Sequence, residues 1–440
     1  MQRMIAGWVA LVMMVVVALP AYARVRIDLS QPGAAPIPVA VPAFYGATPD
    51  EARFGADLAS VMRNNFGNST PFKVVRTDAY LQTPAQLASQ GVAYGDWRGI
   101  NADALVTGSV STVEGGQIKV EYRLYDTQTE QQLVGRRYTV DARFWRHIAH
   151  RISDDIYKEL TGEDGYFATR IVHIGETKGL DNKTQKKLCV MDQDGANYQC
   201  LTDGSSLVLT PRFNPNLQKI IYMSYANGLP RLYFLDMPTG QQTIIGDFEG
   251  LNSTPRFNAD GNKVAMTLTT GHEGNPEIYE MDMGSRALKR LTFWRGIDTS
   301  PSYSPDGKKI VFNSDRGGVP ALYIMDANGS NVQRLTYGEG RYYSPAWSPR
   351  GDLIAFVKQS KGIFHIGVID PEGREERLLT DSYMDDNPTW APNGRVLVFS
   401  RQANRSDRTR VMTIDLTGYN LRELPTPTNA SDPAWSPLIK

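Results

Sequence analysis

The sequence predicts two domains, a small N-terminal α+β domain followed by a six-bladed β-propeller whose closing blade is composite. Three observations support this prediction. A Pro-x-aromatic step recurs at intervals of 43 to 46 residues, at Pro211, Pro255, Pro301, Pro345, Pro388 and Pro433. Strand-ending aspartates keep the same period, at Asp192, Asp236, Asp282, Asp326, Asp370 and Asp415. The region before them lacks the repeat and mixes helical with strand patterns.

Each repeat holds about four strands, which is typical of a propeller blade. In the third repeat Pro301-Ser302-Tyr303 begins one strand, and Ser304-Pro305-Asp306-Gly307 supplies turn residues. Ile310-Val311-Phe312 and Leu322 to Met325 supply the apolar bulk of the next two strands. A sheet of this size cannot bury both faces alone, so the blades must pack against each other.

The order of the landmarks predicts how the ring closes. Asp192 precedes the first Pro-x-aromatic step, whereas Pro433 stands almost at the C-terminus. We therefore expect Pro433 to Pro437 to form the inner strand of the last blade, and the stretch from about Ala168 to Leu201 to form the rest. Such closure leaves no long open sheet edge.

The chain divides into residues 1–23, 24–165 and 166–440. The first segment reads as a secretory signal, with Arg3, an apolar run from Ile5 to Leu19 and the cleavage motif Ala21-Tyr22-Ala23. The alternative is an uncleaved anchor, but the run is shorter than the roughly 20 apolar residues that span a bilayer. We therefore expect an exported chain without a membrane span.

Residues 24–165 predict the α+β domain. Val25, Ile27 and Leu29 alternate with polar residues as in a half-buried strand, and the proline-containing run from Pro36 to Phe44 favours an edge strand. Thr48-Pro49-Asp50-Glu51 is a capping box that opens a helix, and Thr83-Pro84 starts a shorter one. Three strands over 104–111, 117–125 and 133–140 precede a long helix that ends at Gly162, and 163–165 form the linker.

Composition gives no sign of a nucleic-acid partner, because 47 basic residues balance 47 acidic ones. The two cysteines, Cys189 and Cys200, flank Asp194-Gly195, which signals a type I′ hairpin. A two-residue loop would make them a hydrogen-bonded pair, whose side chains are less close. A disulfide and two small buried residues both remain open.

Catalytic patterns are missing. There is no G-x-S-x-G, H-E-x-x-H or phosphate-binding glycine loop, and we expect no cofactor and no metal. His147 and His150 are close in sequence, but their spacing is that of two histidines on a helix surface. The six periodic aspartates are expected to accept hydrogen bonds within their own turns.

Polar residues gather just before each Pro-x-aromatic step, where the inner strands begin at one mouth of the channel. They include Asn252, Ser253, Thr254, Asp298, Thr299, Tyr342, Tyr343, Asp385 and Asp386. Tyrosines among short polar residues are typical of binding surfaces, although an ordinary solvated rim has a similar composition.

The signal, the domain order, Val25-Arg26-Ile27 and the closing Pro433-Ala434-Trp435-Ser436-Pro437 together resemble the TolB family of the Tol–Pal system of Gram-negative bacteria. The resemblance covers essentially all of the mature chain and departs at Ala34-Ala35-Pro36. It implies a monomeric, non-catalytic periplasmic protein that supports outer-membrane integrity and invagination during cell division.

The resemblance also implies two partners. The lipoprotein Pal would bind at the channel mouth, on the loops that carry Asn252, Ser253, Thr254 and Thr299, with the other polar residues of that mouth beside them. The inner-membrane protein TolA would bind Arg24, Val25, Arg26, Ile27, Asp28 and Leu29, within a segment that reaches about Gly33. An alternating strand of this kind suits addition to a partner's sheet. The rival interpretation is a periplasmic propeller enzyme acting on a sugar or lactone, which would need convergent acid and base groups in the channel.

Overall fold

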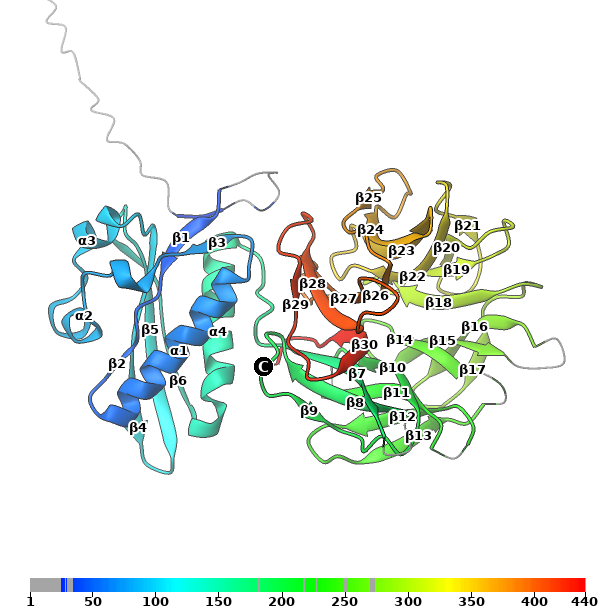
Figure 1. Cartoon of the computed structure of the whole chain (residues 1–440), viewed down its shortest axis with the longest axis horizontal. Helices are drawn as coiled ribbons and strands as arrows, with labels where there is room; N and C mark the ends of the chain where they lie inside the picture. Colours follow the sequence, from blue (N-terminus) through cyan, green and yellow to red (C-terminus); the bar gives the residue numbers. More distant parts are fainter. Residues whose placement is uncertain are drawn as a thin grey trace, which may run out of the picture.

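The protein consists of an N-terminal domain and a propeller that lie side by side (Figure 1). The structure, a computed structural model, describes residues 25–27, 29, 35–179, 183–216, 218–226, 228–248, 250, 252–269 and 274–439. Residues 1–23 of the expected signal lie outside this set, as do Arg24 and Asp28. Within the described residues no helix is long and apolar enough to cross a membrane.

The N-terminal domain is a sheet with helices on both faces. Its strands are β1 (Ile37–Ala40), β2 (Tyr45–Gly46), β3 (Phe72–Val74), β4 (Ala104–Val113), β5 (Gln117–Asp126) and β6 (Gln131–Asp141). Its helices are α1 (Pro49–Gly67), α2 (Pro84–Gln90), α3 (Tyr94–Gly99) and α4 (Trp145–Thr161), with 3₁₀ turns at Thr77–Ala79 and Ala142–Phe144. The path of the sheet is β3-β1-β4-β5-β6, with β2 beside β4. Alternate residues face opposite sides, so Val39 packs in the core under α1 and α4, whereas Ala40 packs with Trp97 of α3.

Most of the expected elements form. Thr48 and Glu51 make the capping box of α1, and Thr83 and Gln86 make one for α2. Gly162 ends α4 at φ +78°, and a Cβ there would lie 2.0 Å from Nη2 of Arg26.

Two strand predictions in this domain are wrong. The described residues 25–27 and 29 belong to no strand, and the Ile27 amide donates instead to the Leu160 carbonyl at the end of α4 (2.9 Å). The run that contains Pro38 is a central strand, since β1 pairs in parallel with both β3 and β4.

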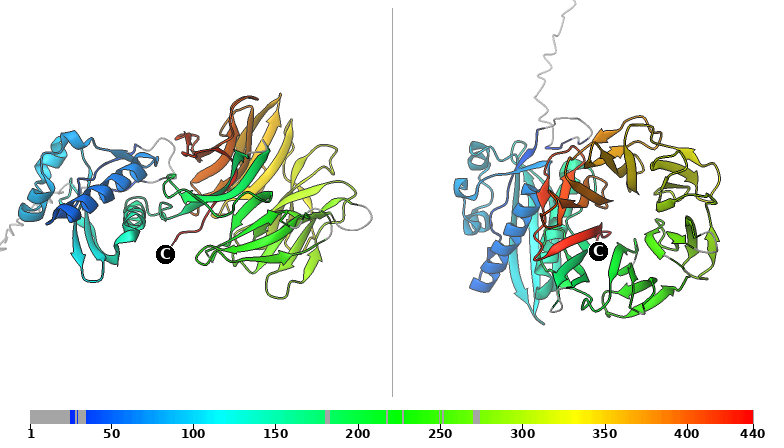
Figure 2. Two further views of the ribbon diagram at one scale, coloured as in Figure 1. Left: turned by 60° about the horizontal axis from the view of Figure 1, so that its bottom comes forward. Right: turned by 45° about the vertical axis from the view of Figure 1, so that its right-hand side comes forward.

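The propeller has six four-stranded blades around a channel (Figure 2, right). The first three blades are β10 (Val208–Phe213), β11 (Lys219–Ser224), β12 (Arg231–Asp236), β13 (Gln242–Gly246); β14 (Asn252–Phe257), β15 (Lys263–Thr269), β16 (Pro276–Asp282), β17 (Leu288–Arg290); and β18 (Asp298–Tyr303), β19 (Lys309–Ser314), β20 (Ala321–Asp326), β21 (Gln333–Arg334). The next two are β22 (Arg341–Trp347), β23 (Ile354–Ser360), β24 (Ile363–Ile369), β25 (Arg377–Leu378); and β26 (Met384–Trp390), β27 (Val396–Gln402), β28 (Arg410–Asp415), β29 (Arg422–Glu423).

The sixth blade confirms the predicted composite closure. Its strand order is β30 (Asn429–Trp435), β7 (Arg170–Lys178), β8 (Thr184–Asp192) and β9 (Gln199–Cys200). The last strand of the chain is thus the inner strand of a sheet begun about 260 residues earlier. Trp435 donates from Nε1 to the Thr169 hydroxyl (2.7 Å), and the Ser436 hydroxyl accepts from the Arg170 amide (2.8 Å).

The periodic aspartates and aromatic residues have the predicted structural roles. Asp282 accepts from the amides of Gly284 and Ser285, and Asp370 accepts from three amides of its own turn. Trp390 donates from Nε1 to the Ala346 carbonyl of the preceding blade (2.9 Å), so the aromatic residue joins neighbouring blades.

The propeller has one face toward the N-terminal domain and one away from it. Glu163 pairs with Arg350 and Arg395, which lie between the first and second strands of their blades. Asn420, between a third and a fourth strand, donates to Thr70 (3.1 Å). Both kinds of turn lie on the same face because antiparallel strands alternate in direction. We call the channel opening on this face the near mouth and the opposite opening, where the inner strands begin, the far mouth.

A disulfide joins Cys189 and Cys200. The connecting turn is longer than the predicted two-residue type I′ loop, since Asp192 N donates to Ala196 O and Gly195 N to Asp192 O. The Leu201 amide bonds to Leu188 O, which makes 188 and 201 the hydrogen-bonded pair. The cysteines therefore occupy the closer, non-hydrogen-bonded site, with Cα atoms 3.9 Å apart.

Removing residues 430–440 should open the ring. The deletion takes away most of β30 and exposes the buried partners of Ala434 and Trp435. We expect loss of cooperative thermal unfolding, followed by circular dichroism, and rapid proteolysis of the propeller. Deleting only Lys440 is the control, and a truncated chain that still melts cooperatively would contradict composite closure.

Reduction should weaken the sixth blade. The disulfide closes a loop with a sequence separation of 11, for which chain entropy gives a stabilisation of about 3 kcal/mol. We expect dithiothreitol to lower the unfolding free energy by about 2–3 kcal/mol in denaturant titrations. The Cys189→Ala/Cys200→Ala variant should have a lower unfolding free energy than the oxidised protein, and dithiothreitol should not change it. If the reductant lowered the unfolding free energy of both proteins equally, the bond would be contradicted.

Candidate functional site

Two half-buried residues of each inner strand lie directly before the proline, on the side of the far mouth. A bulge interrupts the pairing of the first and second strands in all six blades, just before the proline. The residue before each proline has a left-handed φ of 49° to 55°, at Thr210, Thr254, Ser300, Ser344, Asn387 and Asp432. The residue before that one is half-buried as well, at Leu209, Ser253, Thr299, Tyr343, Asp386 and Ser431. We call these twelve residues the far-mouth ring.

Hydrogen bonds link the ring from blade to blade. The Ser344 hydroxyl donates to Asp386 (3.0 Å), and the Asn387 amide group donates to Asp432 (2.6 Å). Burial raises the pKa of Asp386, and the Asp432 carboxylate raises it further, against the hydrogen bonds that it accepts. This part of the ring is a preorganised acidic surface.

The other side of the ring is polar and less engaged. Within the described part of the chain, the hydroxyl groups of Ser253 and Thr299 have no hydrogen-bond partner, and the half-buried Tyr343 packs against the hydrophobic cluster between blades four and five. These groups can therefore bind an incoming ligand without first breaking an internal bond. Asn252 lies in β14, and its side chain is outside the described set.

Three residues expected at this mouth are buried away from it. Asp298 pairs with Arg316 (2.6 Å), Asp385 binds Arg401 through both oxygens (2.7 Å each), and the Tyr342 hydroxyl donates to Glu376 (2.7 Å). All three occupy the third position before the proline, which points between the sheets because side chains alternate along a strand. Sequence reasoning treated the whole polar run as one surface and missed this alternation.

These contacts also bear on the enzyme alternative. Asp298 and Asp385 each have an arginine partner, and the Thr380 hydroxyl donates to Asp385 as well (2.6 Å). Carboxylates held in this way serve as structural ion pairs between strands and loops rather than as a convergent acid and base pair.

The N-terminal segment lies at the joint between the domains. The Val25 amide donates to Asp126 (2.9 Å), and Ile27 is 7% exposed in the core that α4 helps to form. The Leu29 carbonyl accepts from Arg395 of the propeller (3.3 Å). Three of the six residues expected to bind TolA therefore contact the chain itself through backbone groups, and Arg26 lies against Gly162.

Arg395 is the centre of this joint. It pairs with Glu163 of the linker through Nε (2.7 Å) and Nη2, and Arg350 reaches the same carboxylate (3.2 Å). Burial alone would raise the pKa of Glu163, but the hydrogen bonds and charges of the two arginines hold it below its ordinary value. Sequence reasoning missed this hub because Glu163 and Arg395 are 232 residues apart.

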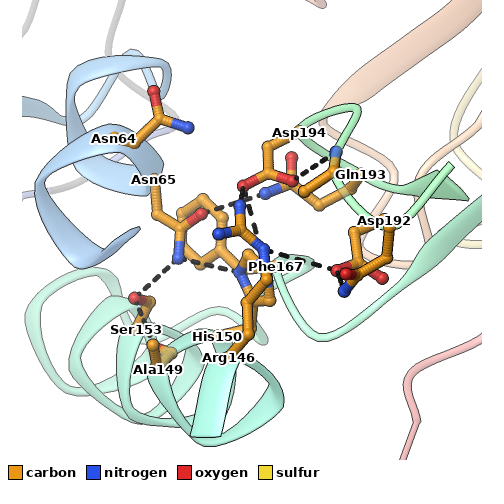
Figure 3. A network of polar contacts seen from close by, with 12 residues as sticks. Asn64, Asn65, Arg146, Ala149, His150, Ser153, Phe167, Asp192, Gln193 and Asp194 are labelled. Atoms are coloured by element: carbon orange, nitrogen blue, oxygen red, sulfur yellow. Dashed lines mark hydrogen bonds and ion pairs between the residues drawn. The ribbon is translucent and has the colours of Figure 1, made fainter. Parts of the chain in front are cut away.

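A second polar contact joins the domains at the N-terminal half of α4 (Figure 3). The Asn65 amide of α1 donates to Ser153 (2.9 Å) and contacts Nδ1 of His150 (3.1 Å). Gln193, in the turn after β8, donates to the Asn65 carbonyl oxygen (3.0 Å). The sixth blade is thus tied to both long helices of the N-terminal domain.

His150 is buried in this network, so its predicted place on the helix surface is wrong. Burial lowers the pKa of His150 to about 4, although Asp194 acts against the shift. Within the described residues, His150, Asp192 and Asp194 form a group whose ligand atoms lie within 4.8 Å. Arg146 already supplies a positive charge there, because it pairs with Asp194 and approaches Asp192 (3.5 Å). Arg170 also approaches Asp192 (3.9 Å), so both carboxylates of this domain contact lie beside arginines.

Comparisons with known proteins agree over the whole chain. The family model of the TolB amino-terminal domain matches residues 25–133, and that of the TolB beta propeller domain matches residues 157–439. The Tol-Pal system protein TolB of Paramagnetospirillum magneticum is 53% identical over 443 residues, which cover 99% of this chain and 98% of the relative. The crystal structure of TolB from Acinetobacter baumannii superposes with a TM-score of 0.81 at 29% identity, covering 92% of this chain and 97% of that one. The chain, with its N-terminal α+β domain and six-bladed propeller, therefore belongs to the TolB family.

Proposed function

We propose that this chain links two partners of the Tol–Pal system in the periplasm, Pal at the far-mouth ring and TolA through residues 24 to about 33. As a TolB protein the chain is a non-catalytic protein of the cell envelope. Through these two contacts it would support outer-membrane integrity and invagination during cell division. The observation that carries the proposal is the separation of the two surfaces, since the ring lies on the far face and the segment at the joint on the near face.

The far-mouth ring suits a protein ligand. Apart from Leu209, its residues are polar, and all twelve are half-buried on bulged backbone, so little conformational entropy is lost on binding. Ser253 and Thr299 offer unpaired hydroxyl groups, and Tyr343 adds an amphipathic ring of the kind enriched in interfaces. Asp298, Tyr342 and Asp385 would support this surface from behind rather than contact Pal.

The N-terminal segment suits a switchable ligand for TolA. Its described residues, 25–27 and 29, are docked chiefly by Ile27 N to Leu160 O and Arg395 to Leu29 O, and none of these four residues takes part in strand pairing. Once released, its alternating Val25, Ile27 and Leu29 could add to a partner's sheet edge. The docked state would therefore compete with TolA.

One hairpin connects the two surfaces. Strand β26 carries Asp386 and Asn387 at the far mouth, and the turn after it carries Arg395 at the joint. A small reorientation of blade five on Pal binding would change the contacts of Arg395 with the linker and with the segment. Coupling between sites of this kind is typically worth about 1–3 kcal/mol and acts equally in both directions.

A large charged side chain in the ring should block Pal. We expect Thr299→Arg to weaken binding of the soluble Pal domain about tenfold or more, measured by isothermal titration calorimetry, because it fills the mouth and adds an unpaired charge. Gln241→Arg places the same side chain on an exposed residue of the near face and should bind Pal normally. Equal affinities of the two variants would exclude the ring as the Pal site.

Releasing the segment should favour TolA. We expect Arg395→Ala to raise the affinity for the C-terminal domain of TolA several-fold in fluorescence anisotropy, because the binding-competent state becomes more populated. The control is Arg405→Ala, which removes an exposed arginine from the same blade. An unchanged TolA affinity would show that docking by Arg395 does not limit binding.

Deleting residues 24–33 tests the coupling itself. Without the segment, Pal can no longer shift a docking equilibrium, so its affinity should change by about 5- to 150-fold if the coupling has its typical size. Calorimetry of Pal with the deleted and the full exported chain gives this ratio. An unchanged affinity would leave two independent binding sites and no coupling.

A further inference from the structure

Two arginines occupy equivalent positions in neighbouring blades, on the near side of the channel. Each is the middle residue of a Pro-x-aromatic step, Arg212 in blade one and Arg256 in blade two. The same position holds only small residues in the other four blades, namely Ser302, Ala346, Thr389 and Ala434. A cavity of about 500 Å³ remains at the near mouth, and all six residues line it.

Among the described residues, neither arginine has an acidic partner in contact. Nη1 of Arg212 donates to the Pro211 carbonyl (2.5 Å), and Nη1 of Arg256 donates to the Pro255 carbonyl (3.2 Å). Arg212 is only 6% exposed, and its Nε has no hydrogen-bond partner among the described residues. A guanidinium carries five N–H donors, so most of this hydrogen-bonding capacity is unused.

Burial of two like charges is unfavourable here. Desolvation lowers the pKa of Arg212 to about 10, although Asp432 and Asp386 act against it. Desolvation lowers the pKa of Arg256 well below its ordinary value, and the charge of Arg212 lowers it further. The two carboxylates that could compensate are held at the far-mouth ring by Ser344 and Asn387. An anion between the guanidinium groups would restore the balance of charge.

We propose that the near side of the channel is a binding site for a small oxyanion, a carboxylate or a phosphate, held between Arg212 and Arg256. The planar fork of arginine matches both groups through two parallel hydrogen bonds. Solvent reaches the site through the near mouth, whose wall includes the half-buried Phe257 and Trp347 and several prolines. The site is separate from the far-mouth ring, and it requires neither Pal nor TolA.

Thermal shift measurements on the exported chain, residues 24–440, test the site. Sodium phosphate and sodium succinate are compared with sodium chloride at matched ionic strength, because a ligand that binds the folded state raises the melting temperature. We expect one or both oxyanions to stabilise the protein beyond chloride. Phosphate alone would assign a phosphate site, and succinate alone a carboxylate site. If neither exceeds chloride, the proposal is wrong.

Variants locate the effect. We expect Arg212→Met and Arg256→Met each to weaken the oxyanion affinity at least tenfold and to raise the melting temperature in chloride, since an unpaired buried charge is removed. Arg405→Met, an exposed arginine of blade five, should change neither quantity. Equal oxyanion affinity in the three variants would overturn the assignment.

Crystallography of the unchanged exported chain gives a readout that no variant can disturb. In crystals grown with sodium selenate, a tetrahedral oxyanion with an anomalous signal, we expect a peak between the two guanidinium groups. A channel without a peak there would contradict the site even if the variants failed to fold.

Discussion

The contact between Tyr166 and Trp435 links the strand that closes the propeller ring to the interface between the two domains. Trp435 belongs to the last strand of the ring, and Tyr166 directly follows the linker, with ring centroids 5.8 Å apart in an edge-to-face arrangement. Phe167 continues the contact toward Phe66 of α1 and Tyr157 of α4. Edge-to-face pairs of this kind add about 0.5–1.5 kcal/mol each beyond their buried area. The hydrophobic core of the N-terminal domain therefore runs into blades five and six without a break.

This continuity explains why the joint can hold the N-terminal segment in place. Asp154 of α4 accepts from the amides of Phe167 (2.7 Å) and Ala168 (2.9 Å), which fixes the linker directly before β7 begins. The polar contacts of Arg395, near the C-terminal end of α4, and of Gln193, near its N-terminal half, then form between two domains that the linker has already positioned. Few contacts are needed for docking the segment, and a weakly docked segment can be released at a modest energetic cost.

The sequence predicts the propeller well because its landmarks are local. A turn such as Ser304 to Gly307 is encoded by four adjacent residues, and composite closure follows from the order of two periodic series. The candidate site is predicted only in part. The sequence reveals the polar runs before the prolines, but which residue of a run is buried, as Asp298 is, and which is half-buried, as Thr299 is, depends on the pairing register.

Contacts across the joint could not be predicted, because no local pattern pairs Glu163 with Arg395 or places His150 beside Asn65. The edge strand predicted from the prolines around Pro38 is wrong for a similar reason. Its strand is central, and its carbonyl accepts from the Asp103 amide (3.0 Å), a pairing set by residues far along the chain.

The bulge before each proline also gives the channel opposite charges at its two ends. Asp386 and Asp432 precede the proline, on the side of the far mouth, whereas Arg212 and Arg256, one residue beyond the proline, line the near mouth. The proline fixes φ between these positions, so the two sets cannot exchange sides without breaking the inner strands. In a narrow channel of low dielectric, fixed charges act more strongly than at an open surface. We therefore expect a cationic or hydrogen-bond-donating group to be favoured at the far mouth and an anionic group at the near mouth, so that the channel would distinguish ligands by the side from which they enter.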